Sequence, residues 1–352
     1  MRKIILIAIF VSAITVVFAQ KKPKNVVFII GDGMGLAHIY AGMVANGNQL
    51  QMERFKNIGF SKTYSANNFT TDSGAGGTAL SSGIKTQNGM IGMTPDSLAS
   101  ESILEVAEKN NLSTGIVTTC DITHATPASF IAHQLSRKMF QEIAADFLKT
   151  DIDVFIGGGR KNFEKRLDNR NLTSELKTKS YNIAYTLDEA RKIKSGKLAG
   201  LLYDDHNPPM PERGDMLPDA TIIALDILDN NKKGFFLMIE GSQIDWASHK
   251  NDADQIVKEV LDLDKTIGKV LDFAEKNKNT LVIVTADHES GGLTLPKGNM
   301  AKKEFTAEFS TKEHSGVLVP VFAFGPGSEN FTGFMENTSF KNKLIKLLKL
   351  KG

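Results

Sequence analysis

Carboxylate side chains stand directly after several short apolar runs of this sequence, where buried strands would end. Asp32 follows the first run within GDGMG, Glu240 follows a later run, and Asp287 lies two residues after another. A carboxylate at a strand end can bridge metal ions, and the glycines around Asp32 let the backbone approach a ligand closely. The pattern therefore predicts metal chemistry at these strand ends.

Histidines accompany two of these runs. Asp245 and His249 are four residues apart, so a helix would place both on one face, as two ligands of one metal or as a solvated carboxylate–imidazole pair. Asp287 and His288 are adjacent, and neighbouring strand residues point to opposite faces. They can therefore share one ion only if the chain has already turned into a loop. His314, in EHSG, completes the set.

A serine and an arginine add a second kind of chemistry. Ser73, in TTDSGAGGTA, precedes small residues that suit a loop entering a helix, and a helix N-terminus stabilises an alkoxide or an incoming phosphate. An ordinary N-cap serine is the alternative. Arg137 can hold two phosphate oxygens with its planar fork, or it can form a surface salt bridge. His124 and Thr126 lie in the same stretch as Arg137 and could equally begin a helix.

The ligand types limit which metals fit. Mixed carboxylate and imidazole ligands suit zinc, whereas all-oxygen ligands suit magnesium. His38, His133 and His206 have no comparable setting, and we interpret them as structural. Cys120 is the only cysteine, so it cannot form an internal disulfide.

The elements that must position these residues follow from the apolar runs, which alternate with helical stretches. This alternation is typical of an α/β fold with a mostly parallel sheet covered by helices on both faces, a three-layer α/β/α sandwich. The predicted strands are 26–30, 115–118, 154–156, 235–239, 281–285 and 317–324, and the predicted helices are 100–110, 140–149, 219–230, 252–277 and 339–350. In open α/β sheets, ligands bind beyond the carboxyl ends of the strands, where the candidate residues stand.

We expect one catalytic domain over residues 20–352, after a signal peptide at residues 1–19. Arg2 and Lys3 precede an apolar stretch that ends at the small residue Ala19, as in a cleaved signal. The stretch is shorter than the roughly 20 residues of a membrane helix, so no stable membrane anchor is expected. The polar segment 161–200 and the proline-bearing segment 207–218 break the strand–helix alternation and are interpreted as insertions near 160–218; a further insertion is expected near 289–313.

Composition excludes several classes of protein. With 41% hydrophobic and 23% charged residues, the chain has ordinary globular usage, which argues against disorder. Its formal charge of +2 falls to about zero once Arg2 and Lys3 are removed. No basic patch is concentrated in the mature chain, so nucleic acid is not an expected partner.

The motifs TDS, ATPAS, EG-x-x-ID-x-x-x-H, TADH and HSG, in this order, resemble the alkaline phosphatase family over residues 25–324. The resemblance implies a serine nucleophile beside two zinc ions and one magnesium ion. By position in the motifs, the implied ligands are Asp245, His249 and His314 for one zinc, Asp32, Asp287 and His288 for the other, and Asp32, Thr126 and Glu240 for magnesium. Arg137 would clamp the phosphate, and Ser73 would form a phosphoserine.

The resemblance further implies a periplasmic or secreted enzyme that hydrolyses small phosphate monoesters and, as a weaker family expectation, forms a homodimer. His124 stands where an aspartate is common, which alters the magnesium site or favours zinc there. Trp246 stands where lysine or histidine is common, which removes a cation near the phosphate. Only a short segment separates His288 from His314, so we expect a reduced crown insertion and a more open site.

Three other functions are compatible with parts of this pattern. A phosphodiesterase of the same superfamily would keep the two-zinc core, but such enzymes usually lack the equivalents of Thr126 and Glu240 and often use threonine as the nucleophile. A sulfatase needs a formylglycine motif, and the surroundings of Cys120 lack the proline and arginine of that motif. An inactive phosphate-binding or metal-storing homologue is the alternative from outside the enzymes.

Overall fold

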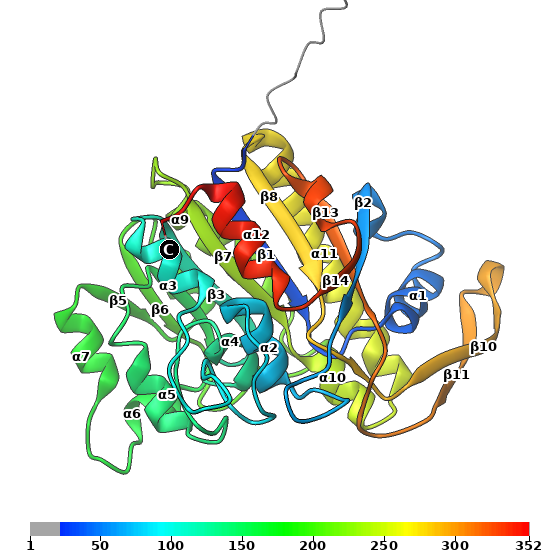
Figure 1. Ribbon diagram of the computed structural model, residues 1–352, viewed down its shortest axis with the longest axis horizontal. Coiled ribbons are helices and arrows are strands. Elements are labelled where there is room, and N and C mark those ends of the chain that lie inside the picture. Colours follow the sequence, from blue (N-terminus) through cyan, green and yellow to red (C-terminus); the bar gives the residue numbers. More distant parts are fainter. Residues whose placement is uncertain (1–21, 352) are drawn as a thin grey trace, which may run out of the picture.

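The computed structural model describes residues 22–351 (Figure 1). The strands are β1 (Asn25–Gly31), β2 (Asn57–Lys62), β3 (Ser113–Asp121), β4 (Val154–Gly158), β5 (Tyr181–Ala184), β6 (Lys197–Leu201), β7 (Phe235–Gly241), β8 (Thr280–Thr285), β9 (Glu289–Ser290), β10 (Leu293–Asn299), β11 (Glu304–Phe309), β12 (His314–Ser315), β13 (Val319–Phe324) and β14 (Gly333–Glu336).

The α-helices are α1 (Leu36–Ala45), α2 (Ser73–Ser82), α3 (Ile103–Lys109), α4 (Ala125–Ala128), α5 (Phe140–Asp146), α6 (Arg160–Glu164), α7 (Leu172–Thr178), α8 (Leu187–Ala190), α9 (Met216–Leu228), α10 (Gln243–His249), α11 (Ala253–Asn277) and α12 (Ser339–Leu348). Short 3-10 helices are η1 (Gln51–Arg54), η2 (Met300–Lys302) and η3 (Ser328–Phe331).

Within residues 22–351, ten strands form one sheet in the order β14-β2-β13-β8-β1-β7-β3-β4-β6-β5. Strand β13 runs antiparallel to both of its neighbours, β8 and β2. The other neighbouring pairs in this sheet are parallel. The predicted mostly parallel sheet is therefore confirmed.

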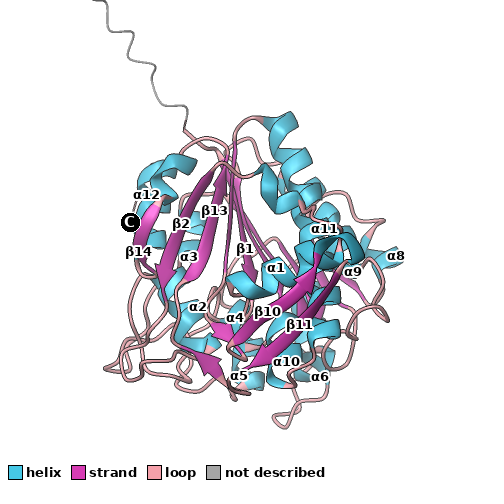
Figure 2. Cartoon of the chain, turned by 90° about the vertical axis from the view of Figure 1, so that its right-hand side faces the viewer, coloured by secondary structure: helices cyan, strands magenta, loops and turns pink. Residues whose placement is uncertain are grey.

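The central strands are buried on both faces because helices cover the sheet from both sides (Figure 2). On β1, Val27 and Ile29 belong to one apolar core with residues of α9 and α11, whereas Val26 and Phe28 belong to a second core with residues of α3 and α12. Alternate side chains of a strand point to opposite faces, so one continuous apolar run serves both cores. This is the three-layer sandwich that the sequence predicts.

The strand order brings the candidate residues to one edge of the sheet. Strands β8, β1, β7 and β3 are neighbours, and Ile30 near the end of β1 pairs with Glu240 on β7 and with Thr285 on β8. Their carboxyl ends are thus level with one another. Glu240 is at the end of β7, and Asp32, Asp287 and the start of α4 follow the ends of β1, β8 and β3, as expected of a ligand site in an open parallel sheet.

Four strands of the sheet were not predicted. Strands β5 and β6 lie in or at the end of the segment 161–200, so the prediction that this segment breaks the strand–helix alternation is wrong. Its interpretation as an insertion stays a prediction. The others are β2 and β14, at the opposite edge. These strands are short or half exposed, with burial broken along β2, β5 and β14. They therefore lack the long apolar runs that marked the central strands.

The segment 207–218 was expected to break the strand–helix alternation, but α9 begins within it. Pro218 is the third residue of α9, in the first turn, where a missing N–H breaks no helical hydrogen bond. Arg213 ties the preceding loop to α11 by donating from Nη2 to Glu259, and to Asp262 Oδ2 at 2.7 Å. All three side chains are buried, and breaking such a network costs about 3–5 kcal/mol. The loop is thus anchored rather than free.

The segment between His288 and His314 forms a β-hairpin from β10 and β11, which extends from the body of the molecule at the right of Figure 1. At its base, β12 pairs with β9, with His314 opposite Ser290. This pairing places His314 close to His288 in space. None of the helices in the described part of the chain has the length and apolar character to cross a membrane.

Candidate active site

Ser73 is the first residue of α2, and the interpretation of Ser73 as an N-cap is wrong. The N-cap is Asp72, whose Oδ1 accepts a hydrogen bond from the Ala75 backbone at 2.9 Å. The prediction that Ser73 lies at a helix N-terminus is confirmed. Its Oγ lies 3.3 Å from Nε2 of His288, and Ser73 is buried. The Ser73 hydroxyl therefore lies at the carboxyl ends of the central strands, where the carboxylates are clustered.

One cluster joins Asp32, Asp287 and His288 at the ends of β1 and β8. Nε2 of His288 lies 3.3 Å from Asp32 Oδ1 and 3.3 Å from Asp287 Oδ2, so the same nitrogen faces Ser73 and both carboxylates. Strand β8 ends at Thr285, and the chain has turned before Asp287. The condition for adjacent residues to share one ion is thereby met.

A second cluster joins Asp245 and His249 on α10 with His314. Nε2 of His249 lies 3.3 Å from Asp245 Oδ2, which confirms the shared helical face, and Nε2 of His314 lies 3.5 Å from Asp245 Oδ1. The Nδ1 atoms face backbone carbonyls, 2.7 Å from Thr71 O for His314 and 2.5 Å from Lys312 O for His249. Such contacts orient each ring and leave Nε2 toward the cluster centre.

A third cluster joins Cys120 at the end of β3, His124 and Glu240. Glu240 is fully buried at the end of β7, and its Oε2 accepts a 2.5 Å hydrogen bond from Thr118. Thr126 lies close by on α4, where its Oγ1 donates to Asp32 Oδ2 at 3.2 Å. His124 is the N-cap of α4, so the helix-start interpretation of this stretch is confirmed.

Arg137 reaches the site from the loop between α4 and α5. Its Nη1 donates to Asp72 Oδ2 at 3.0 Å, and Nη2 lies 3.4 Å from Nε2 of His124. The side chain of Arg137 is one quarter exposed and that of Asp72 is less exposed still, so the two do not form an ordinary surface ion pair. Asp72 binds Arg137 through one oxygen and caps α2 through the other, which links the arginine to the helix that carries Ser73.

The carboxylates raise one another's pKa values. Burial raises the pKa of Asp287 to about 8, and the charges of Asp245 and Glu240 act in the same direction. Burial, with the charges of Asp287 and Asp245, also raises the pKa of Asp32 well above its usual range. Asp245 differs: burial opposes its ionisation, but the His249 hydrogen bond and the nearby imidazoles lower its pKa. Buried carboxylates at such short range need positive charge beside them.

The donor atoms fit metal ions. Among the described residues, Asp32 Oδ1, Asp287 Oδ2, Glu240 Oε1 and His124 Nδ1 are buried and have no hydrogen-bond partner. Orphaned buried polar atoms are costly and call for a ligand. The first two clusters combine carboxylate and imidazole, a donor set that suits zinc. The three clusters contain seven of the eight predicted metal ligands; Thr126 is the one that they lack. They also contain Cys120 and His124, which were not predicted as ligands.

Trp246 and His206 lie beside the third cluster. The ring of Trp246 is 5.7 Å from that of His124 and 4.6 Å from that of His206. His206, interpreted as structural, accepts a hydrogen bond at Nδ1 from the Asp121 backbone at 3.0 Å and also borders the site. The other two histidines set aside in the sequence are held away from the clusters: His133 contacts Gly92 and Glu105, and His38 is buried against Ser248.

Three neighbours of the site were missed in the sequence. Asp72 was seen only as the residue before Ser73, Cys120 was considered only for disulfide and sulfatase chemistry, and Ser290 was not considered as a site residue. Ser290 Oγ contacts Asp245, and lies 3.2 Å from Nδ1 of His288, so it connects two clusters. The spacing of Cys120 four residues before His124 was the one available signal, since a turn after a strand can bring such residues together.

Comparisons with known proteins agree with one another. A family model described as alkaline phosphatase matches residues 23–308. Alkaline phosphatase 4 of Bacillus subtilis is 35% identical, covering 93% of this chain and 89% of its own length, and the alkaline phosphatase of Escherichia coli is 29% identical, covering 95% and 88%. The solved structure of the alkaline phosphatase from the Antarctic bacterium TAB5 is 43% identical with a TM-score of 0.90, covering 95% of this chain and all of that one.

Proposed function

The chain belongs to the alkaline phosphatase family and is a phosphatase, and on that premise we propose that Ser73 is the nucleophile with which it hydrolyses phosphate monoesters. The observation that carries the proposal is the position of Ser73 Oγ. It lies at the first turn of α2 and 3.3 Å from the histidine nitrogen that also faces Asp32 and Asp287. A nucleophile, a cation-binding cluster and a helix N-terminus therefore converge on one point.

The proposed cofactors are two zinc ions and one magnesium ion. Asp245, His249 and His314 would hold one zinc, and Asp32, Asp287 and His288 the other. The third ion, magnesium by family resemblance, would lie near Glu240 and Thr126; one variant of the TAB5 enzyme has magnesium bound in a site named M3. When bound, the zinc ions lower the pKa of a coordinated hydroxyl and offset charge on the leaving group.

The residues of the chain divide the reaction between them. Ser73 Oγ releases its proton to solvent and forms a bond to phosphorus as the bond from phosphorus to the leaving alkoxide breaks. The alkoxide takes up a proton from solvent, and a phosphoserine remains. Water then attacks that phosphoserine from the opposite side, and inorganic phosphate leaves as Ser73 regains its hydroxyl. Arg137, held by Asp72 Oδ2 at 3.0 Å, presents its remaining N–H groups to the equatorial phosphate oxygens.

The experiment that tests the function compares two substrates. The protein lacking residues 1–19, supplied with zinc and magnesium, should hydrolyse p-nitrophenyl phosphate at alkaline pH faster than bis-p-nitrophenyl phosphate. The predicted roles of Thr126 and Glu240 favour the monoester. A rate ratio in favour of the diester would instead support a phosphodiesterase of the same superfamily.

Arg137→Ala is expected to raise the inhibition constant of inorganic phosphate by roughly 10- to 150-fold. The reason is that a charge-assisted hydrogen bond to the phosphate contributes about 1.5–3 kcal/mol of binding free energy. Inhibition of p-nitrophenyl phosphate hydrolysis by phosphate measures this constant. Arg54→Ala is the control, since Arg54 pairs with Asp272 and Glu275 on α11 instead. Unchanged inhibition in Arg137→Ala would show that the arginine is not the phosphate clamp.

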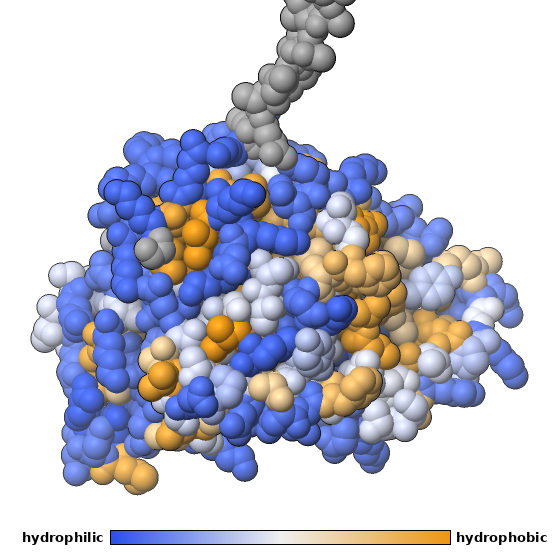
Figure 3. All heavy atoms as spheres, viewed as in Figure 1, coloured by the Kyte–Doolittle hydropathy of each residue, from blue (hydrophilic) through white to orange (hydrophobic). Residues whose placement is uncertain are grey.

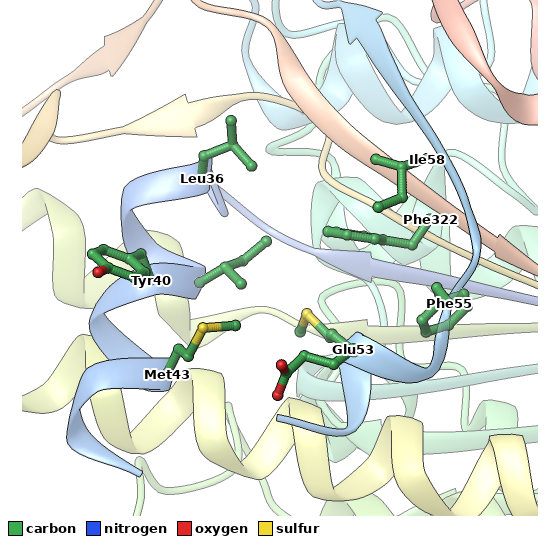
Figure 4. A pocket seen from close by; sticks show the side chains of 9 residues that line it. Leu36, Tyr40, Met43, Glu53, Phe55, Ile58 and Phe322 are labelled. Atoms are coloured by element: carbon green, nitrogen blue, oxygen red, sulfur yellow. The ribbon is translucent and has the colours of Figure 1, made fainter. Parts of the chain in front are cut away.

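We also propose that the protein forms a homodimer through an apolar face around α1 and β2. Leu36, Tyr40 and Ile58 are large side chains that are each about half exposed, at 52%, 50% and 49%. They border a pocket of about 510 Å³ (Figure 4). Figure 3 shows apolar surface over β2 and β14, where Phe334 is exposed. Contiguous exposed apolar area of this kind marks association surfaces.

Sedimentation of the purified protein tests the proposed dimer. Ile58→Asp is expected to convert the dimer to a monomer, because a buried, unpaired charge opposes association. Leu167→Asp is the control, since Leu167 is also exposed but lies in the loop between α6 and α7. A wild-type monomer at all concentrations would contradict the dimer.

Export to the periplasm or medium is a further proposal. Its support is the basic start and apolar stretch of residues 1–19, which lie outside the described residues. The mass of the protein recovered from outside the cytoplasm should correspond to a chain beginning at Gln20.

A further inference from the structure

The third cluster of the site contains a sulfur atom that the proposed magnesium site does not use. We propose that Cys120 is a metal ligand, and that Cys120, His124 and Glu240 form a site for a borderline-soft divalent cation such as zinc. The inference deepens the proposed function, because it concerns the third cation of the same site. It also differs from the all-oxygen magnesium site that the family resemblance implies.

The geometry supports sulfur ligation. One ligand atom from each of the three residues lies within 4.8 Å of the other two. The Sγ of Cys120 is 3.5 Å from Oε2 of Glu240, and both residues are fully buried. Strands β3 and β7 hold them in place, since Thr118 on β3 is paired in register with Glu240 on β7. A single ion could therefore contact the thiolate, the imidazole and the carboxylate at once.

Two further atoms point to a ligand at this place. Oε1 of Glu240 and Nδ1 of His124 are buried, and within residues 22–351 neither has a hydrogen-bond partner. A fully buried carboxylate with one orphaned oxygen is a costly arrangement. A cation between the cysteine, histidine and glutamate would satisfy both atoms. A magnesium ion at Glu240 and Thr126 alone would account for Glu240 Oε1 but would leave His124 Nδ1 without a partner.

The donor set decides which cation fits. Thiolate and imidazole are the ligands that zinc and its chemical relatives prefer, whereas magnesium favours oxygen ligands. On binding, the Cys120 thiol would lose its proton to solvent. The resulting thiolate and the Glu240 carboxylate would together neutralise the two positive charges of the ion.

The rival interpretation is that Cys120 only packs. Its Sγ lies 3.1 Å from Thr118 Oγ1 and 3.2 Å from the carbonyl of Asp121, contacts that a buried thiol makes without any metal. Packing alone predicts that Cys120 can be replaced by serine with no change in metal content. Ligation predicts that the replacement removes one soft cation.

Cobalt substitution distinguishes these interpretations. The purified protein is stripped of metal, refilled with Co²⁺ alone, and its near-ultraviolet absorption is recorded. A thiolate-to-cobalt charge-transfer band is expected, and because Cys120 is the only cysteine of the chain, that band can come from no other residue. The absence of a band in fully cobalt-loaded wild-type protein would overturn the proposal without reference to any variant.

Two variants complete the test. Cys120→Ser is expected to lose the band and to bind one zinc equivalent fewer than the wild type when zinc and magnesium are offered together. Ser242→Ala is the matched control, since Ser242 Oγ contacts Thr118 at 2.9 Å but is not a member of the cluster. Equal zinc content in wild type and Cys120→Ser would contradict ligation. Neither readout depends on turnover, so the sulfur site and the phosphatase mechanism can fail separately.

Discussion

Replacing Ser73 by alanine is expected to lower kcat for p-nitrophenyl phosphate by at least about 10³-fold, because the covalent route is lost while the metal ligands remain. The Oγ atom lies 3.3 Å from His288 Nε2, and no other hydroxyl among the described residues is placed beside this nitrogen at the start of a helix. Steady-state kinetics measure the loss. Mass spectrometry of acid-quenched protein should find a phosphate on the wild type and none on Ser73→Ala.

Ser81→Ala is the matched control for this variant. Ser81 is also a buried serine of α2, and its Oγ donates to the backbone carbonyl of Ser129 at 2.6 Å. Its loss should cost about 1 kcal/mol of stability and leave kcat within a few-fold. If Ser73→Ala retained wild-type turnover, Ser73 would not be the nucleophile, and the proposed mechanism would be wrong.

Metal removal is the second large effect. Chelation should reduce phosphatase activity to background, because the carboxylates of the clusters then face one another without a cation. It should also destabilise the fold, since an ion at 100 times its dissociation constant contributes about 2.7 kcal/mol per site. Activity should return only when zinc and magnesium, or zinc in excess, are restored.

The stability of the chelated protein should fall as pH rises. Burial raises the pKa of Asp287 from 3.8 to about 8, so between these values the folded state holds a proton that the unfolded state has released. Stability decreases with pH wherever the folded state binds more protons. The destabilisation therefore develops between about pH 4 and pH 8, and bound metal should remove it.

Thermal unfolding of chelated and metal-loaded protein at several pH values measures this effect. The difference in melting temperature between the two forms should widen toward alkaline pH. Elemental analysis must first establish that the chelated sample is metal-free. Full activity in a metal-free sample would exclude the metal-dependent mechanism.

The central fold was predictable because its strands are long and buried on both faces. The runs within β1, β7 and β8 are continuous and apolar, and helices α9 and α11 were predicted to within a few residues at each end. The edge strands β5 and β14 and their neighbours β6 and β2 were not predicted. All four are short, and burial is interrupted along β2, β5 and β14, so these three have no continuous apolar run.

The clustered residues that follow one another closely along the chain were also predictable. Asp245 and His249 share a face of α10 because four residues make about one helical turn. Asp287 and His288 share a cluster because β8 ends at Thr285. In each case the geometry is local, so residue spacing was sufficient.

Contacts between distant parts of the chain depended on the tertiary structure. The order β8-β1-β7-β3 decides that Asp287, Asp32, Glu240 and Cys120 lie at neighbouring strand ends, and the pairing of β9 with β12 decides that His314 returns to the site. Cys120 became a candidate ligand only once β3 and β7 were seen side by side. The sequence by itself determined which donor atoms are present and which are close along the chain. Only folding decided which of them lie in one cluster, because strand order is set by packing across the whole sheet.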